Sequence, residues 1–138
     1  MFLPRALFAL ACAAVALPAA AQEGDWALQG NDPVAYFDEG SAESGRSDIM
    51  LEWRGKIYHF QSEDNLMRFE SNPRNYAPQF GGLCVVALSE GREVPGDPDI
   101  FVIHDGRLYL MRDPAARSQF LSSTEAIIAA ARDQRARK

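Results

Sequence analysis

The chain has 138 residues and a net charge of −5, from 14 basic and 19 acidic side chains. This length is typical of one domain with a single hydrophobic core. The acidic balance disfavours nucleic-acid binding, which needs a basic surface.

The first 21 residues have the pattern of a secretory signal peptide. Arg5 precedes an apolar run, and three alanines end the segment. Because the run is shorter than the roughly 18 to 20 residues of a spanning helix, we expect cleavage after Ala21 and no transmembrane segment in the mature chain. The mature protein, residues 22–138, is then periplasmic or secreted. Lipid attachment at Cys12 is the competing interpretation.

The first predicted strand spans Val34 to Phe37. It follows Asn31, Asp32 and Pro33, which are turn-forming residues, so Asp32 is better explained by the turn than by catalysis. The polar, Gly- and Ser-rich stretch that follows, residues 38–48, indicates an exposed loop.

A hairpin is predicted around Arg54 and Gly55, because apolar residues alternate with polar ones on the strand before that turn. The predicted register pairs Trp53 with Lys56, Leu51 with Tyr58 and Ile49 with Phe60. It places His59 opposite Met50, on the face of the hairpin that is expected to be the more hydrated.

Helices and a second hairpin are predicted in the remainder of the chain. Ser62 is a good N-cap for a short helix. Residues 83–88 fit either a strand or a short helix, and Asp105-Gly106 is a strong hairpin signal. Asp113 caps a helix that begins at Pro114, and a last helix runs over residues 125–135. We therefore predict an α+β domain of antiparallel hairpins packed with short helices, with its C-terminal helices from about residue 114. No internal repeat is detected.

Cys84 is the only cysteine left after signal removal, so the mature chain has no internal disulfide. Its thiol is a soft ligand for a transition metal, with His59 as a second ligand, a reactive thiol, or a small buried apolar group. His104 lies beside a predicted turn, where exposure is expected. A closed zinc site is disfavoured, because CxxC and HExxH are absent.

Three segments carry a resemblance to a known family: NDPVAYF, WRGKIYHFQSEDNLMRFESNPRNYAPQFGGLC and GDPDIFVIHDGRLYL. Together they resemble exported single-domain members of the YHS-domain family. Tyr58, His59 and Ser62 match the Tyr-His-Ser signature. The resemblance implies a metal-handling context. In the related metal domains, however, the strand-to-helix junction carries cysteines, and here it reads Gln61 to Asn65.

The resemblance and the lone thiol predict a non-enzymatic, exported domain that binds a transition metal, copper first, through Cys84 and His59. A periplasmic partner protein or water would complete the coordination. The alternative is a binding module for a small organic ligand or a protein partner, with an aromatic pocket near Tyr58 and Tyr76 and a structural cysteine. A thiol-dependent enzyme is disfavoured, because no residues with the spacing of a catalytic triad are evident.

Overall fold

The computed structural model describes residues 25–138, so the predicted signal peptide lies outside the described part of the chain. The fold is α+β, with two antiparallel hairpins and short helices in one small domain. Within residues 25–138, no helix combines the length and apolar character that crossing a bilayer requires.

The first half of the fold is built around one hairpin. The turn η2 (Ala27–Gly30) and helix α1 (Ala35–Asp38) precede strands β1 (Arg46–Trp53) and β2 (Lys56–Phe60), and helices α2 (Glu63–Ser71) and α3 (Pro73–Tyr76) follow them. As predicted, Ser62 caps α2, because its hydroxyl accepts a hydrogen bond from Asn65 N.

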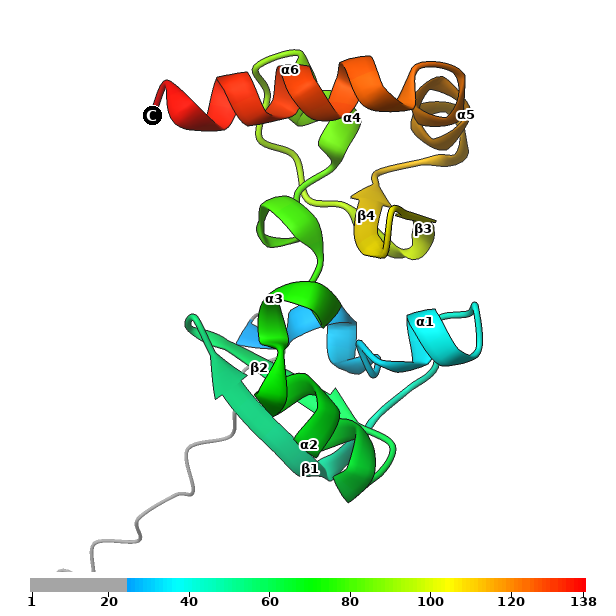
Figure 1. Cartoon of the computed structure of the whole chain (residues 1–138), viewed down its shortest axis with the longest axis vertical. Helices are drawn as coiled ribbons and strands as arrows, with labels where there is room; N and C mark the ends of the chain where they lie inside the picture. Colours follow the sequence, from blue (N-terminus) through cyan, green and yellow to red (C-terminus); the bar gives the residue numbers. More distant parts are fainter. Residues whose placement is uncertain (1–24) are drawn as a thin grey trace, which may run out of the picture.

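The second half repeats this order of elements. The turn η3 (Gln79–Gly82) and helix α4 (Val85–Ser89) precede strands β3 (Asp97–His104) and β4 (Arg107–Met111), and helices α5 (Pro114–Ser122) and α6 (Thr124–Ala136) follow. Asp113 caps α5 by accepting from Ala116 N, as predicted. Figure 1 shows the second-half elements gathered at one end of the molecule, with β1, β2 and α2 at the other.

The two halves are a structural repeat, which corrects the expectation that the chain has none. From β1 to the start of the last helix, each position matches one that lies 51 residues later: strands 46–53 match 97–104, strands 56–60 match 107–111, and helix 63–71 matches helix 114–122. Both hairpins turn on a residue with positive φ followed by glycine, Arg54-Gly55 and Asp105-Gly106. The side chains differ at most of these positions, which is why the sequence pattern alone did not indicate a repeat.

Two glycines support the repeat independently. A Cβ at Gly45 would lie 2.5 Å from the backbone of His59, and a Cβ at Gly96 would lie 2.4 Å from the side chain of Leu110. Gly45 N donates to Gly30 O, and Gly96 N donates to Gly82 O, both at 2.9 Å. The same close approach of backbone to strand therefore occurs once in each half, and only glycine allows it.

Each half has its own apolar core. The first contains Tyr58, Phe60 and Phe69, and the second contains Tyr109, Met111 and Phe120 at the matching positions. Strand β4 connects them: Leu108 and Leu110 belong to the first core, whereas Tyr109 and Met111 belong to the second. Alternate strand residues point to opposite faces, so β4 is covered on both sides.

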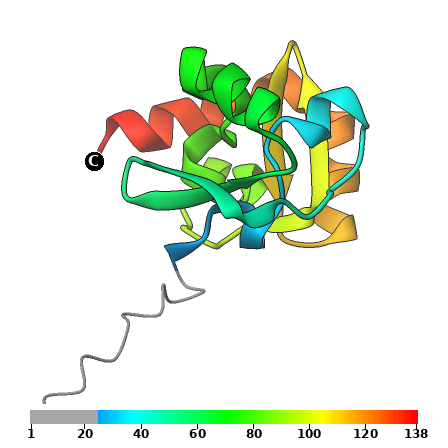
Figure 2. The ribbon, with the colours of Figure 1, turned by 90° about the horizontal axis from the view of Figure 1, so that it is seen from below.

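The interface between the halves includes a specific polar contact. The Tyr36 hydroxyl in α1 donates to Pro98 O in β3 at 2.8 Å, and the Tyr36 ring meets the edge of Phe101. The β3–β4 hairpin consequently lies between α1 of the first half and α5 of its own half (Figure 2).

Three local predictions are corrected or decided. The predicted strand at Val34 to Phe37 is wrong, because α1 occupies that segment. The Asp32 carboxylate accepts from Val34 N at 2.8 Å, which supports a turn into helix rather than an extended chain. The 83–88 segment contains a helix, α4, rather than a strand.

The register of the first hairpin is confirmed near its turn and wrong farther away. Trp53 pairs with Lys56, Leu51 with Tyr58 and Met50 with His59, as predicted. Phe60, however, pairs with Arg46 and not with Ile49, because an irregularity interrupts the ladder. The second hairpin has the same irregularity between Asp97 and Phe101, so it is a feature of the repeat.

Candidate functional site

A cleft of about 490 Å³ opens beside the turn of the first hairpin. Three parts of the chain form it: the β1–β2 turn, the segment from α3 through η3, and the end of α6. Its lining comprises Trp53, Arg54, Lys56, Tyr58, Arg74, Ala77, Pro78, Gln79, Phe80, Gly81 and Arg135. Segments from both halves therefore contribute.

The charge of this cleft is opposite to that of the whole chain. Arg54, Lys56, Arg74 and Arg135 line it, whereas no Asp or Glu is among its described lining residues. The chain as a whole carries five more acidic than basic residues. The arginines around this recess favour an anion over a cation.

Aromatic side chains form the apolar part of the cleft. The Arg54 guanidinium lies over the Trp53 ring, 4.6 Å from its centroid, which fixes a cation at the rim. Tyr58 is almost fully buried, and burial raises its pKa to about 12. The Tyr58 hydroxyl therefore stays protonated at neutral pH and adds no negative charge to the cleft.

A smaller chamber of about 200 Å³ adjoins the cleft. The two share Lys56, Tyr58, Pro78 and Gly81. The rest of the chamber is lined by η2 residues and by residues of the second half, including Pro95, Pro98 and Leu110, together with Trp26. Among residues 25–138, the buried indole N–H of Trp26 has no hydrogen-bond acceptor.

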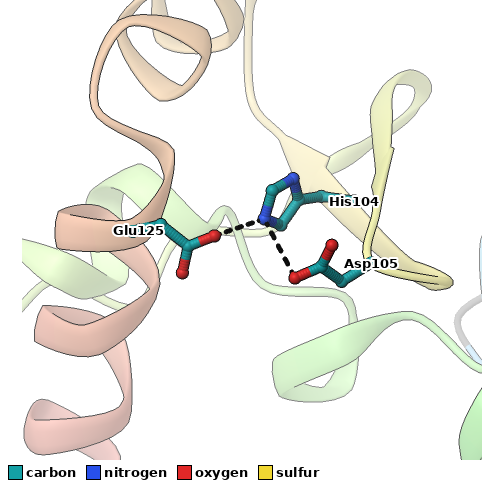
Figure 3. Close-up of side chains that lie close together, drawn as sticks. All are labelled: His104, Asp105 and Glu125. Atoms are coloured by element: carbon teal, nitrogen blue, oxygen red, sulfur yellow. Dashed lines mark hydrogen bonds and ion pairs between the residues drawn. The ribbon is translucent and has the colours of Figure 1, made fainter.

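A cluster of three metal-ligand residue types lies at the turn of the second hairpin (Figure 3). His104 Nε2 is 2.6 Å from Glu125 Oε1 and 3.5 Å from Asp105 Oδ2. Glu125 is in the first turn of α6, where the helix dipole favours a negative side chain. In the part of the chain that the structure describes, this is the one His, Cys, Asp and Glu cluster compact enough to hold a metal ion.

The basic cleft and this cluster occupy matching places in the repeat. Shifting by 51 residues takes Trp53 to His104 and Arg54 to Asp105, and the same shift takes Arg74 to Glu125. In each half, two of these residues come from the hairpin turn and the third from a later helix. That helix is α3, after α2, in the first half and α6, after α5, in the second. The same site is thus basic in the first half and acidic with an imidazole in the second.

The structure places Cys84 deep in the second core. Its side chain is fully buried, and its neighbours in that core are apolar residues such as Val85, Tyr109 and Met111. Its sulfur accepts a weak hydrogen bond from Ala87 N at 3.5 Å and so caps α4. Such a position fits the alternative that the sequence left open, a structural cysteine.

His59 is buried at 3% exposure, so the expectation of a hydrated face was wrong. The Trp26 ring packs against it edge to face with 4.5 Å between centroids, and Gly30 approaches its Nδ1 side. Burial lowers the pKa of His59 below its ordinary value. His59 matches the apolar Leu110 of the second half, so this position is buried in both halves.

Cys84 and His59 lie in different surroundings: Cys84 is in the second core, and His59 packs against Trp26. Among residues 25–138, neither belongs to a group of three or more possible metal ligands. The predicted copper site formed by these two residues stays a prediction. Of the predicted aromatic pocket, Tyr58 lines the cleft, whereas Tyr76 packs against Phe37 with 5.3 Å between ring centroids.

Asp32 is fully buried and structural, in agreement with its prediction as a turn residue. Besides Val34 N, its carboxylate accepts from Gln61 N and from Asn65 Nδ2, each at 2.7 Å. It therefore ties α1 to the start of α2. Its carboxylate oxygens are used in these hydrogen bonds, and it is not among the residues that line the basic cleft.

The sequence did not single out Arg74, Glu125 or Arg135. Arg54 was interpreted only as a turn residue, and His104 as an exposed one. A comparison of the two hairpins at a spacing of 51 residues would have shown that Arg54 and Asp105 are equivalent. Comparisons of the chain with protein-family models, curated proteins and solved structures found no significant match.

Proposed function

We propose that this protein is an exported, non-enzymatic binding module for a small organic anion with a flat apolar body. The observation that carries the proposal is the basic, aromatic-lined cleft at the first hairpin turn, on a chain that is acidic overall. The cysteine is structural in this account, and the chemistry of recognition is charge and stacking.

The size and lining of the cleft suit such a ligand. Ligand sites in proteins are commonly about 300 to 1,000 Å³ and combine apolar walls with a few polar groups. Trp53 and Phe80 provide flat surfaces, and Arg54 and Arg74 provide planar guanidinium groups that bind carboxylate or phosphate in two places at once. The adjoining chamber gives the apolar body of the ligand room to extend.

Backbone strain is concentrated at the same place. Outside the two hairpin turns, the non-glycine residues with positive φ among residues 25–138 are Leu28, Gln29 and Phe80. Phe80 lines the cleft, and Leu28 and Gln29 line the chamber. Such conformations cost about 1 to 3 kcal/mol each and are found preferentially at functional sites. Their location supports a binding role for this surface.

Calorimetric titration with phenyl phosphate tests the proposal, with benzylamine as a cationic probe of the same shape. We expect the anion to bind and the cation not to bind. The substitutions Arg74→Gln and Arg54→Asn should each weaken anion binding about tenfold or more, because a hydrogen bond to a charged group contributes about 1.5 to 3 kcal/mol. Asparagine suits the positive φ at position 54.

Arg46→Gln is the matched control. Arg46 belongs to the same hairpin and pairs with Asp48 at an exposed site away from the turn. Its removal changes the net charge equally but should leave anion binding unchanged. Equal weakening by Arg46→Gln and Arg74→Gln, or equal binding of phenyl phosphate and benzylamine, would overturn the proposal.

A further inference from the structure

We infer that His104, Asp105 and Glu125 form a surface site for a divalent transition-metal cation, with zinc as the reference ion. This site is distinct from the predicted Cys84 and His59 pair and does not rest on the proposed anion binding. Its ligand atoms all lie within 4.8 Å of one another.

The distances already approach those of a metal centre. Zinc binds imidazole nitrogen and carboxylate oxygen at about 2.0 to 2.2 Å, so neighbouring ligand atoms around a tetrahedral ion are roughly 3 to 3.5 Å apart. The gap between His104 Nε2 and Asp105 Oδ2 is 3.5 Å. The pair of His104 and Glu125, at 2.6 Å, must open by less than about 1 Å, and the two carboxylates start within 4.8 Å of each other.

The backbone positions the ligands, and the exposed carboxylates leave room for adjustment. His104 is the last residue of β3, and Asp105 has the left-handed backbone conformation of the tight turn. The strand and the turn therefore hold the backbone of both ligand residues in place. The Glu125 side chain is 78% exposed and free to shift outward. Arg107, the first residue of β4, is the basic residue next to this turn in the sequence. Its guanidinium donates a hydrogen bond to Gly106 O.

The repeat places a recess at the matching position of the first half. The matching residues of the first half, Trp53, Arg54 and Arg74, all line the basic cleft. In the first half these matching residues line a recess. In the second half the same positions carry His104, Asp105 and Glu125, which are possible metal ligands. A mixed imidazole and carboxylate donor set suits zinc, copper or nickel better than magnesium or calcium, which prefer oxygen alone.

Binding would connect two parts of the second half. Glu125 lies in the first turn of α6, whereas His104 and Asp105 lie at the turn of the β3–β4 hairpin (Figure 3). An ion held by all three joins the helix to the hairpin only in the folded state, so it must raise the stability of the protein.

The test is zinc binding by untagged full chain, measured by calorimetric titration and by the zinc-dependent rise in Tm, with magnesium as the contrasting ion. We expect zinc, and not magnesium, to bind and to raise Tm. His104→Gln and Glu125→Gln should weaken zinc binding about tenfold or more. Asp133→Asn, on the same helix, is the matched control and should behave as wild type.

Two results would overturn the inference. One is zinc binding that His104→Gln and Glu125→Gln leave unchanged, and the other is no zinc-dependent change in Tm in the wild type. If Cys84→Ala abolishes binding while both surface variants retain it, the metal is held at the predicted thiol site instead. Because both variants alter exposed or half-exposed side chains, we expect each to fold, which their Tm without metal verifies.

Discussion

Asp32 and Cys84 occupy the same position in the two halves of the fold. Each backbone N–H bonds at 2.8 Å to the loop before its hairpin, Asp32 N to Glu43 O and Cys84 N to Val94 O. Each side chain accepts a hydrogen bond from a backbone N–H two or three residues later, Val34 N for Asp32 and Ala87 N for Cys84. A carboxylate in one half and a thiol in the other therefore have the same structural role.

This equivalence predicts that Asp32 supports stability rather than binding. Asp32→Ala leaves one buried and two partly buried hydrogen-bond donors without their acceptor and should lower the free energy of unfolding by about 3 kcal/mol. Asp32→Asn keeps one acceptor oxygen and should cost less. Urea unfolding gives both values, and a loss below about 1 kcal/mol for Asp32→Ala would contradict the assignment.

Cys84 should react with thiol reagents only when the second core opens. Its side chain is fully buried, so native labelling must wait for unfolding of α4. We expect the labelling rate to rise with urea in parallel with global unfolding. Labelling that is complete within seconds in native buffer would instead indicate an accessible, reactive thiol, as the metal-ligand prediction requires.

The matching glycines should respond alike to substitution. In Gly45→Ala and Gly96→Ala the new Cβ meets the opposite strand at about 2.5 Å, which forces the hairpin and its preceding loop apart. Each should cost about 1 to 3 kcal/mol. Gly40→Asn is the control and should cost less, because a Cβ there meets no atom within 4 Å and asparagine tolerates the positive φ of 68°. Thermal unfolding of the three variants checks this. A large effect at only one of the two matched positions would argue against the repeat as a shared packing solution.

Stability should fall in alkaline solution because of two buried tyrosines. Burial raises the pKa of Tyr36 and Tyr58 to about 12, above the value of about 10 in the unfolded chain. The contribution of these tyrosines to the free energy of unfolding is fully present below about pH 10 and is lost as pH rises toward 12. The reason is that the tyrosines of the unfolded chain lose their protons at lower pH than those of the folded protein. The loss is roughly 1 kcal/mol for each tyrosine at about pH 11. Urea unfolding at about pH 9 and pH 11 measures it, and Tyr58→Phe should reduce it; equal stability at both would contradict the account.

Local signals predicted most elements of the fold. Ser62 and Asp113 are strong caps, and Asp105-Gly106 is a strong turn, so short-range chemistry decides those elements. The segment before Phe37 was predicted incorrectly because its helix depends on the buried Asp32 carboxylate, which also bonds to residues some thirty positions away. Burial of His59 likewise depends on η2 covering the second face of its hairpin.

The candidate sites were harder to predict because their residues come from distant segments. Arg74 and Arg135 meet the first hairpin turn only in the folded chain, and Glu125 meets His104 across 21 residues. None has a local motif. The one sequence signal, equivalence at a spacing of 51 residues, is weak because the matched side chains have opposite charge.

The most direct test of the account is a two-dimensional NMR titration of the full chain with phenyl phosphate. We expect saturable shifts of the backbone amides at Trp53, Arg54 and Arg74 and along η3, with no comparable change at the matching residues His104, Asp105 and Glu125. Equal shifts at both sets, or none at the first hairpin turn, would contradict it.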